Sequence, residues 1–524
     1  MTESSIVPAL ATLFPIVAGL SLFYIAEYIN LKMREIIAIG TCAITFILIA
    51  SLYPVIAAGG VVESNLRFFA APLPVFFRID GLDFFMAAIA SFLWFITTIY
   101  SPGYLGKHPH ARSRYYSFLL MALGGCLGVF TTGNLLGLFI FFEFMAITTY
   151  VLIAHEEDVY AMFAANKYLY LTIAAGLAVF FGMIIVYFDA GTVSFADTKI
   201  VSEVSSYAFI AFIAFLLGFG IKAGMFPVHV WLPDAHPAAP APASALLSGV
   251  MIKTGAYGLI RVFMNVFSPE FFAASGAYLS GINWANIVTV IATITILLGS
   301  ALAILQDGLK RRLAYSSIAQ IGYILLGISL LSETALVGSI YHIFSHAFMK
   351  GCLFLCAGLI IVQTGKKNIS QLRGIGFKMP ITMLCFTIAS LSMVGIPPFN
   401  GFISKWQLCM GALAVDRPFF VALLIVSSLL NSIYYFPIVV NAFFSKDLSG
   451  EDGGDGHGGH DDHHGGEHHG SHTAHDEGGK GYQLEAPWSM LIPTIVLAVG
   501  CFIFALTPVN WPLELAKSIA QSLF

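Results

Sequence analysis

The sequence predicts an all-α polytopic membrane protein with about fourteen transmembrane helices. Of its 524 residues, 58% are hydrophobic and only 10% are charged, whereas soluble domains contain about 45–50% apolar and 25% charged residues. Apolar runs of about 20 residues recur along the whole chain, and each is long enough to cross a hydrocarbon core of roughly 30 Å as a helix. No soluble domain fits between these runs.

The charges flanking the runs predict the orientation of the chain. We place the spans near residues 6–28, 33–58, 82–104, 115–133, 134–154, 163–189, 207–230, 243–266, 284–305, 313–332, 335–363, 379–413, 418–444 and 486–508. With both termini on the outer side, fifteen basic residues fall on the inner side and six on the outer side. This excess agrees with the positive-inside rule, and an odd number of spans would remove it. We therefore expect a multi-pass protein of the cell's inner (cytoplasmic) membrane.

Glycines and prolines interrupt two spans that lie five apart. The seventh span is broken at Gly218, Gly220, Gly224 and Pro227, and the twelfth at Gly395, Pro397, Pro398 and Gly401. Corresponding breaks predict two inverted five-helix repeats, the arrangement in which many transporters hold ions between half-helices. We assign helices 4–8 to residues 115–266 and helices 9–13 to residues 284–444. Residues 1–114 would supply helices 1–3, and residues 486–524 would supply helix 14.

Residues 445–485 differ in composition from the rest of the chain. The segment between Lys446 and Lys480 is rich in glycine and acidic residues and contains eight histidines. Such a composition cannot pack a core, so we expect a disordered cytoplasmic loop. Metal storage and pH sensing are alternatives, but the histidines lack a fixed ligand spacing, and we assign no metal site.

Other motifs exclude several classes of function. The net charge of −4 and the lack of a basic stripe argue against nucleic acid as a partner. The seven cysteines lie inside apolar runs without cluster-ligand spacing, and the chain has no nucleotide-binding loop. We therefore expect no cofactor and no catalytic or redox centre in this chain.

Ionisable residues inside the spans are the main functional signal. Such a side chain at mid-membrane costs at least about 2.5–3.5 kcal/mol and usually faces the protein interior or a water-filled cavity. Glu143 lies in the fifth span, Lys222 in the broken seventh and Lys253 in the eighth. A structural ion pair between Glu143 and Lys222 is the alternative, but it leaves the other buried lysines without partners. The set predicts a proton or cation pathway.

The second half of the chain carries the rest of this set. His342, His346 and Lys350 are spaced i, i+4, i+8, so they share one helix face over about 12 Å. One histidine alone would more often be a packing residue, but three groups in register predict a relay. Lys405 follows the second break, where prolines leave backbone carbonyls without partners. The alternative for Lys405 is snorkelling to the surface.

Asp234 and His236 lie between the seventh and eighth spans. We assign them to the pathway entrance of the first half. A turn and helix cap is the alternative role.

These residues lie in segments that resemble the proton-conducting antiporter subunits. That family includes membrane-arm subunits of respiratory complex I, membrane-bound hydrogenases and multisubunit Mrp sodium/proton antiporters. The resemblance is carried by residues 222–261, and also by 77–85, 141–145, 311–323, 342–355 and 395–406. It implies that Glu143 and Lys222 form the coupling pair and that Lys253 is the central relay. It also implies that His342, His346 and Lys350 link the relay to an exit-side lysine, Lys405.

The resemblance implies an ion-translocating subunit that moves H⁺, with Na⁺ as a candidate counter-ion, among other hydrophobic subunits in a lipid bilayer. Lys405 stands where the M-type subunit of complex I usually has glutamate, which makes the chain more similar to the D-type Mrp subunit or its hydrogenase counterpart. A redox-driven enzyme whose electron carriers lie on other chains is the alternative. Nothing in the sequence separates the two. A structural scaffold is a third reading, against which the buried charges argue.

Overall fold

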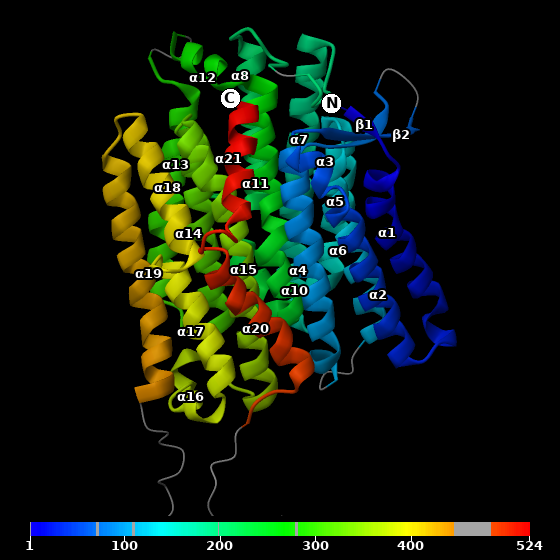
Figure 1. The fold of residues 1–524 in the computed structure, drawn as a ribbon, viewed down its shortest axis with the longest axis vertical. Helices are drawn as coiled ribbons and strands as arrows, with labels where there is room; N and C mark the ends of the chain where they lie inside the picture. Colours follow the sequence, from blue (N-terminus) through cyan, green and yellow to red (C-terminus); the bar gives the residue numbers. More distant parts are fainter. Residues whose placement is uncertain (1, 70–72, 107–110, 198, 278–280, 445–483) are drawn as a thin grey trace, which may run out of the picture.

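The computed structural model describes residues 2–69, 73–106, 111–197, 199–277, 281–444 and 484–524, and it forms a bundle of membrane-length helices (Figure 1). Ten of the described helices are long and apolar enough to cross a membrane, and Pro380–Val394 and Trp488–Ile503 are shorter apolar helices. The predicted loop at 445–485 lies outside the described residues except for Leu484 and Glu485. The expected polytopic all-α fold is confirmed.

The first part of the chain contains helices and one small sheet. The helices are α1 (Val7–Ile25), α2 (Leu31–Ala50), the short α3 (Tyr53–Ala57) and α4 (Gly81–Leu105). Strand β2 (Val61–Phe68) pairs with β1 (Thr2–Ser4) in parallel and with β3 (Val75–Ile79) antiparallel. This sheet was not predicted from the sequence, because its strands are short and flank apolar runs that dominate the hydropathy.

The two predicted repeats follow in order. The first contains α5 (Arg112–Thr131), α6 (Leu135–Ile153), α7 (Val159–Ala190), α8 (Ser206–Ala223), the short α9 (Leu232–Ala238) and a continuous span built from α10 (Ala241–Leu246), η2 (Leu247–Met251), α11 (Ile252–Arg261) and η3 (Val262–Phe267). After the short α12 (Pro269–Ala274), the second contains α13 (Trp284–Ile304), α14 (Leu309–Ser329), α15 (Glu333–Thr364), the short α16 (Ile375–Lys378), α17 (Pro380–Val394), α18 (Asn400–Ala414) and α19 (Phe419–Phe444).

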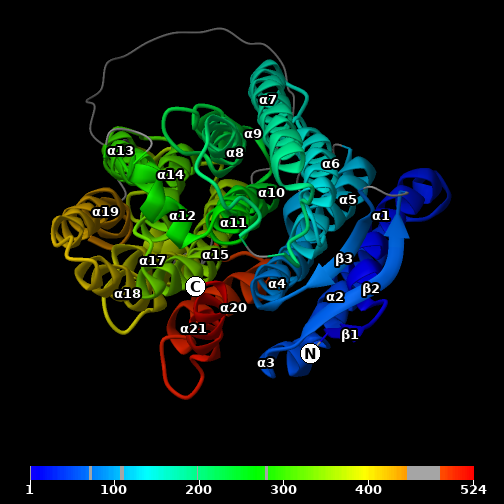
Figure 2. The same ribbon diagram turned by 90° about the horizontal axis from the view of Figure 1, so that it is seen from above.

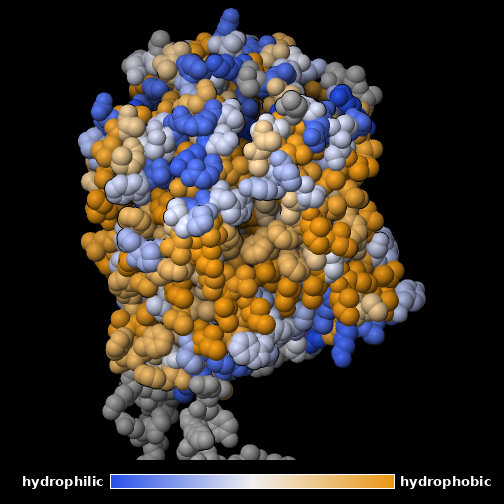
Figure 3. All heavy atoms as spheres, in the orientation of Figure 1, coloured by the Kyte–Doolittle hydropathy of each residue, from blue (hydrophilic) through white to orange (hydrophobic). Residues whose placement is uncertain are grey.

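The C-terminal segment forms two helices, α20 (Trp488–Ile503) and α21 (Trp511–Leu523), where one was expected. Each of the fourteen predicted spans coincides with a described helix, and the twelfth coincides with the pair α17 and α18. Both chain termini lie at the same end of the bundle (Figure 1), as an even number of spans requires. Hydrophobic residues dominate the middle of the face shown in Figure 3, and hydrophilic residues gather nearer its ends.

Both broken spans end a helix in the same way. Helix α8 ends before Gly224 at φ +80°, and α17 ends before Gly395 at φ +88°. A glycine just after a helix adopts this left-handed conformation without steric cost and stops the helix. Helix α8 begins at the end where both termini lie, whereas α17 begins at the opposite end, next to α16 (Figure 1). The two breaks therefore have opposite orientations.

Burial separates central helices from peripheral ones. The most apolar window of the span from α10 to η3 is 100% buried and that of α15 is 89% buried, against 33% for α2 and α19. Viewed from above, α11 and α15 lie centrally while α1, α2 and α19 lie at the rim (Figure 2). The central helices are therefore the ones that can shield ionisable groups from lipid.

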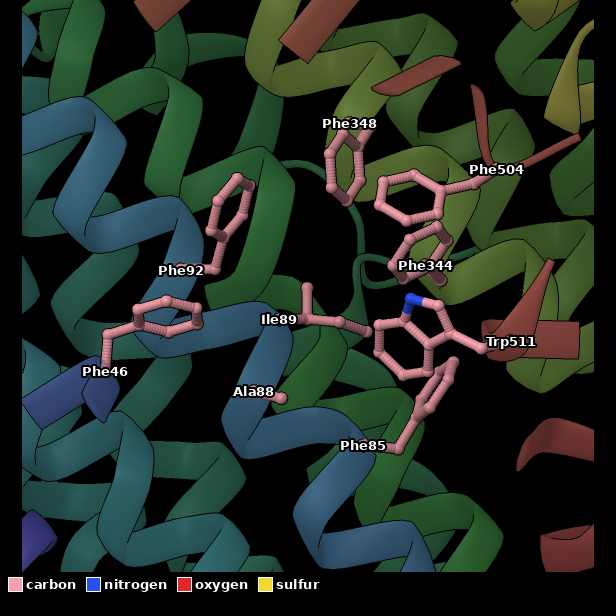
Figure 4. A pocket seen from close by; sticks show the side chains of 9 residues that line it. All are labelled: Phe46, Phe85, Ala88, Ile89, Phe92, Phe344, Phe348, Phe504 and Trp511. Atoms are coloured by element: carbon pink, nitrogen blue, oxygen red, sulfur yellow. The ribbon is translucent and has the colours of Figure 1, made fainter. Parts of the chain in front are cut away.

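Helix α15 has two chemically different faces. Phe344 and Phe348 line an apolar cavity of about 190 Å³ together with aromatic residues of α2, α4 and the C-terminal helices (Figure 4). His342 and His346 precede these phenylalanines by two positions, which is about 200° around a helix. The histidines therefore face away from the aromatic cavity.

Candidate functional site

Glu143 and Lys222 lie on two helices that both pack against α7, and they do not bond directly. Glu143 is on α6, and its Oε1 lies against Gly176 of α7, where an added Cβ would collide with it. Lys222, in the last turn of α8, donates a hydrogen bond of 2.7 Å to the hydroxyl of Tyr168. The described ion pairs, within 4.0 Å, do not include Glu143 with Lys222. The alternative of a direct structural pair is therefore not what forms.

Aromatic rings and a helix end hold the ammonium group of Lys222. Its Nζ lies 5.0 Å from the centroid of the Tyr168 ring and 5.6 Å from that of Phe142. Such rings attract a cation through their negative faces, and the C-terminal end of a helix also favours positive charge. In the same turn, the indole of Trp231 donates to the Ile221 carbonyl at 2.8 Å. Lys222 thus occupies a cation site made without a carboxylate contact.

Lys253 belongs to α11, which lies centrally in the bundle (Figure 2). Its side chain is 1% exposed and donates to the carbonyl of Ser248. Ser248 belongs to η2, a π-helical turn in which the regular helical hydrogen bonding is altered. Such turns occur often at functional sites. The described ion pairs include none made by Lys253.

The polar face of α15 carries the three residues predicted to form a relay. The rings of His342 and His346 are 5.9 Å apart between centroids and nearly parallel. His342 Nδ1 is 2.9 Å from Ser404 Oγ on α18, whereas both ring nitrogens of His346 are buried without a described partner. Lys350 Nζ donates to the Leu313 carbonyl, the Ser316 hydroxyl and the Tyr435 hydroxyl at 2.8, 2.8 and 3.2 Å.

Lys405 occupies the second helix break. Its Nζ donates to the carbonyls of Met393 and Val394 at 3.0 and 2.8 Å, and to Ser428 Oγ at 2.9 Å. These carbonyls end α17, where the break removes their helical partners. The residue is only 7% exposed, so its side chain does not snorkel to the surface. The lysine therefore satisfies backbone groups that the break leaves open.

Asp234 and His236 lie next to a polar cavity at the end of the bundle opposite the termini. Asp234 pairs with Lys167 of α7 at 2.8 Å and with Arg311 of α14 at 3.6 Å, so it bridges these two helices. His236 is fully buried against the Phe354 ring at 4.6 Å, and its ring nitrogens have no described partner. The neighbouring cavity, of about 480 Å³, is lined by Pro237–Pro240 and by charged residues including Glu156, Asp158, Lys310 and Lys367.

A second group of buried charges was not predicted from the sequence. Arg261 is one of the six basic residues that the charge count assigned to the outer side, but it is fully buried. It donates to both carboxylate oxygens of Asp80 at 2.7 Å, to Asp83 and to Asn265 at 2.9 Å. Tyr257 completes this arginine cluster by donating to Asp83 at 2.6 Å. The one available signal was position, since Arg261 follows Lys253 by eight residues in the same span.

Hydroxyl and amide partners of the lysines were also missed. Tyr168 contacts Lys222, and Ser316, Tyr434, Tyr435 and Asn431 surround the region between Lys350 and Lys405. The chain has 21 tyrosines, so the residue type alone does not distinguish Tyr168, Tyr434 and Tyr435 from the other tyrosines.

The helices that carry the predicted residues pack in series. Contacts connect α6 to α7, α7 to α8, α8 to α11, α11 to α14, α14 to α15 and α15 to α18. Figure 2 shows this series crossing the bundle. Groups of three or more His, Cys, Asp or Glu side chains suited to a metal ion are absent from the described residues.

Buried ionisable groups on membrane-length helices, beside two broken helices of opposite orientation, are typical of a transporter-like membrane subunit. The family described as NADH:quinone oxidoreductase/Mrp antiporter, TM, matches residues 132–431, which is more than half of the chain. The chain belongs to this family.

Individual relatives and solved structures agree with that assignment. NADH-quinone oxidoreductase subunit N of Desulforudis audaxviator is 35% identical over 82% of this chain and 81% of its own length. The D-type subunit of a Na⁺/H⁺ antiporter of Alkalihalophilus pseudofirmus is 28% identical over 83% and 87%. The Mrp complex of Dietzia sp. contains a chain with the same fold, with a TM-score of 0.81, 21% identity and coverage of 98% and 97%. The resemblance found in the sequence is confirmed.

Proposed function

We propose that this chain is the proton-translocating subunit of a multisubunit complex in the cell's inner membrane. The pathway runs from Glu143 and Lys222 through Lys253 to the polar face of α15 and then to Lys405. Asp234 and His236 lie at its entrance, beside the polar cavity. The observation that carries the proposal is that Lys222, Lys253, Lys350 and Lys405 are all buried and all held by neutral oxygen atoms.

The chemistry of these contacts supports proton transfer. Burying a charge without a paired counter-charge is costly, so such sites normally serve a function. A lysine whose partners are carbonyls and hydroxyls can release and regain a proton, because no fixed carboxylate requires its charge. Gln320 of α14 and His342 and His346 of α15 have buried polar side-chain atoms without a described hydrogen-bond partner. Such buried polar atoms are suited to bind water. Water between these groups would complete a path that direct contacts leave open.

We assign the chain a function like that of the D-type Mrp subunit, with H⁺ exchanged against Na⁺. The relative from the Na⁺/H⁺ antiporter of Alkalihalophilus pseudofirmus and the fold shared with a chain of an Mrp complex support this assignment. Lys405 supports it as well, since a lysine at this break is similar to the D-type pattern. Its partners are then other hydrophobic subunits.

A redox-driven complex is the second candidate. The relative with 35% identity is part of an NADH-quinone oxidoreductase, and this identity exceeds the 28% shared with the Na⁺/H⁺ antiporter relative. In such a complex the electron carriers would lie on other chains, and this subunit would move protons with the same residues.

The deciding experiment is mass spectrometry of the proteins that co-purify with this chain from native membranes in mild detergent. Small hydrophobic companions alone identify a cation/proton antiporter. Companions with iron–sulfur or nickel sites identify the redox-driven complex and contradict the antiporter assignment. Recovery of the chain by itself, together with no ion-dependent ΔpH in vesicles, would contradict both.

A further inference from the structure

Helix α19 presents polar residues inward although most of its surface is exposed at the rim of the bundle (Figure 2). Its most apolar window is only 33% buried, yet its buried stripe includes Ser427, Asn431, Tyr434 and Tyr435. These positions recur at three- and four-residue spacing and therefore share one face. Buried polar groups at membrane depth cost free energy unless they are bonded. Apolar packing therefore does not explain why the buried face of α19 carries four polar side chains.

The stripe forms a continuous hydrogen-bonded connection between two pathway lysines. At one end, the Ser316 hydroxyl accepts from Lys350 at 2.8 Å and lies 3.1 Å from the Tyr434 hydroxyl. In the middle, the Tyr434 hydroxyl donates to Asn431 Oδ1 at 2.6 Å. At the other end, Asn431 Nδ2 donates to the Met393 carbonyl at 3.2 Å. Lys405 donates to the same carbonyl at 3.0 Å.

The histidine face of α15 lacks such continuity. His342 contacts Ser404, but its Nε2 and both nitrogens of His346 have no described hydrogen-bond partner. Between Lys350 and Lys405, direct bonds therefore run through α19 and not through the histidines.

We propose that Asn431 and Tyr434 are positioning residues that couple the protonation of Lys350 to the charge at Lys405, alongside the histidine face. This inference rests on the proposed proton pathway. The Tyr434 hydroxyl has one proton and two acceptors in reach, Asn431 Oδ1 and Ser316 Oγ. While Lys350 is charged, it donates to Ser316, and the tyrosine proton points to Asn431.

Loss of the proton from Lys350 reverses these bonds. The neutral amine keeps two N–H bonds, to the Leu313 carbonyl and the Tyr435 hydroxyl. Its lone pair accepts from the Ser316 hydroxyl, whose oxygen in turn accepts from Tyr434. Asn431 thereby loses the hydrogen bond from Tyr434, and its side-chain amide moves relative to the Met393 carbonyl. Lys405 donates to the same carbonyl, so its hydrogen bond changes as well. The amide and carbonyl carry no proton between the lysines. They transmit the hydrogen-bonding state of one lysine to the other.

The test is a double-mutant cycle of ion-dependent ΔpH in vesicles, normalised to assembled protein, with Asn431→Leu, Tyr434→Phe and the combined variant. Each single change should slow transport by about tenfold, since each removes a buried hydrogen bond from the connection. Because both act in one connection, the combined variant should be no slower than either single variant. The pH dependence of transport should shift in all three. Ser432→Ala is the matched control, because the Ser432 hydroxyl donates to the backbone of its own helix.

Three outcomes would overturn the inference or its basis. Native rates and an unchanged pH profile in Asn431→Leu and Tyr434→Phe, with Lys405→Ala inactive, overturn the coupling but leave the pathway intact. Strictly additive losses with an unchanged pH profile also overturn it, because they indicate structural roles only. Native transport by Lys405→Ala overturns the proposed pathway itself. If Asn431→Leu fails to assemble, Tyr434→Phe decides, since it removes only a hydroxyl.

Discussion

The arginine cluster and the row of lysines are both buried, yet they solve the problem of buried charge differently. Arg261 donates to Asp80, Asp83 and Asn265, so its charge is fixed by carboxylates. The lysines instead donate to hydroxyls and carbonyls. A paired charge keeps one state and stabilises a fold, whereas an ammonium among neutral oxygens can change its state. Burial alone therefore does not separate structural charges from candidate pathway charges, and the chemistry of the partners is what distinguishes the two groups.

The largest effect should come from breaking the arginine cluster. Arg261→Leu leaves the buried Asp83 without its cation, whereas the half-buried Asp80 keeps its ion pair with Arg78. Removing one partner of a buried ion pair costs about 3–5 kcal/mol. We expect little or no monodisperse protein in size-exclusion chromatography after detergent extraction. Arg67→Leu is the control, because Arg67 is 59% exposed and pairs with Glu63 at the surface. Normal yield and stability of Arg261→Leu would contradict the claim that the arginine cluster, unlike the row of lysines, stabilises the fold.

Glu143→Gln should abolish transport without affecting assembly. Glu143 is not in a described ion pair, so the substitution breaks no salt bridge and keeps the shape of the side chain. The measurement is ion-dependent ΔpH in vesicles, normalised to the amount of assembled complex. Loss of assembly together with transport would instead place Glu143 with the structural charges.

Gly176→Ala tests the position of the carboxylate without changing any charge. The new Cβ would overlap Glu143 Oε1, so the carboxylate must move away from its place beside α7. Such overpacking typically costs about 1–3 kcal/mol, and we expect transport to slow by about tenfold. Gly40→Ala is the matched control, because an added Cβ there meets nothing within 4 Å. Equal rates in the two variants would contradict the placement of Glu143.

Tyr168→Phe should have the smallest effect. It removes the hydroxyl that accepts from Lys222 but keeps the ring beneath the ammonium group. Loss of one hydrogen bond of about 1 kcal/mol predicts transport slower by roughly fivefold. Tyr170→Phe, at a position that is 70% exposed, should transport at the native rate. An unchanged rate in Tyr168→Phe would show that the ring alone holds Lys222.

The sequence predicted the helices and the buried lysines because both follow from hydropathy. A lysine inside an apolar run is visible without a structure, and glycine and proline mark the broken helices. Partners were not predictable in the same way, since Arg261 lies near the end of its span and its carboxylates come from a distant segment. The contact between Asn431 and the Met393 carbonyl depends on how α19 packs against α17, which hydropathy does not encode. The pathway roles of the predicted residues remain predictions.

The most direct test of the central claim compares Lys405→Ala with Lys199→Ala in ion-dependent ΔpH measurements on vesicles that contain equal amounts of assembled complex. Lys405 is buried among neutral oxygens, whereas Lys199 is 55% exposed and pairs with Glu270. We expect Lys405→Ala to assemble and to lose transport, and Lys199→Ala to transport at the native rate. Native transport by assembled Lys405→Ala would contradict the claim that the lysines held by neutral oxygens carry the pathway.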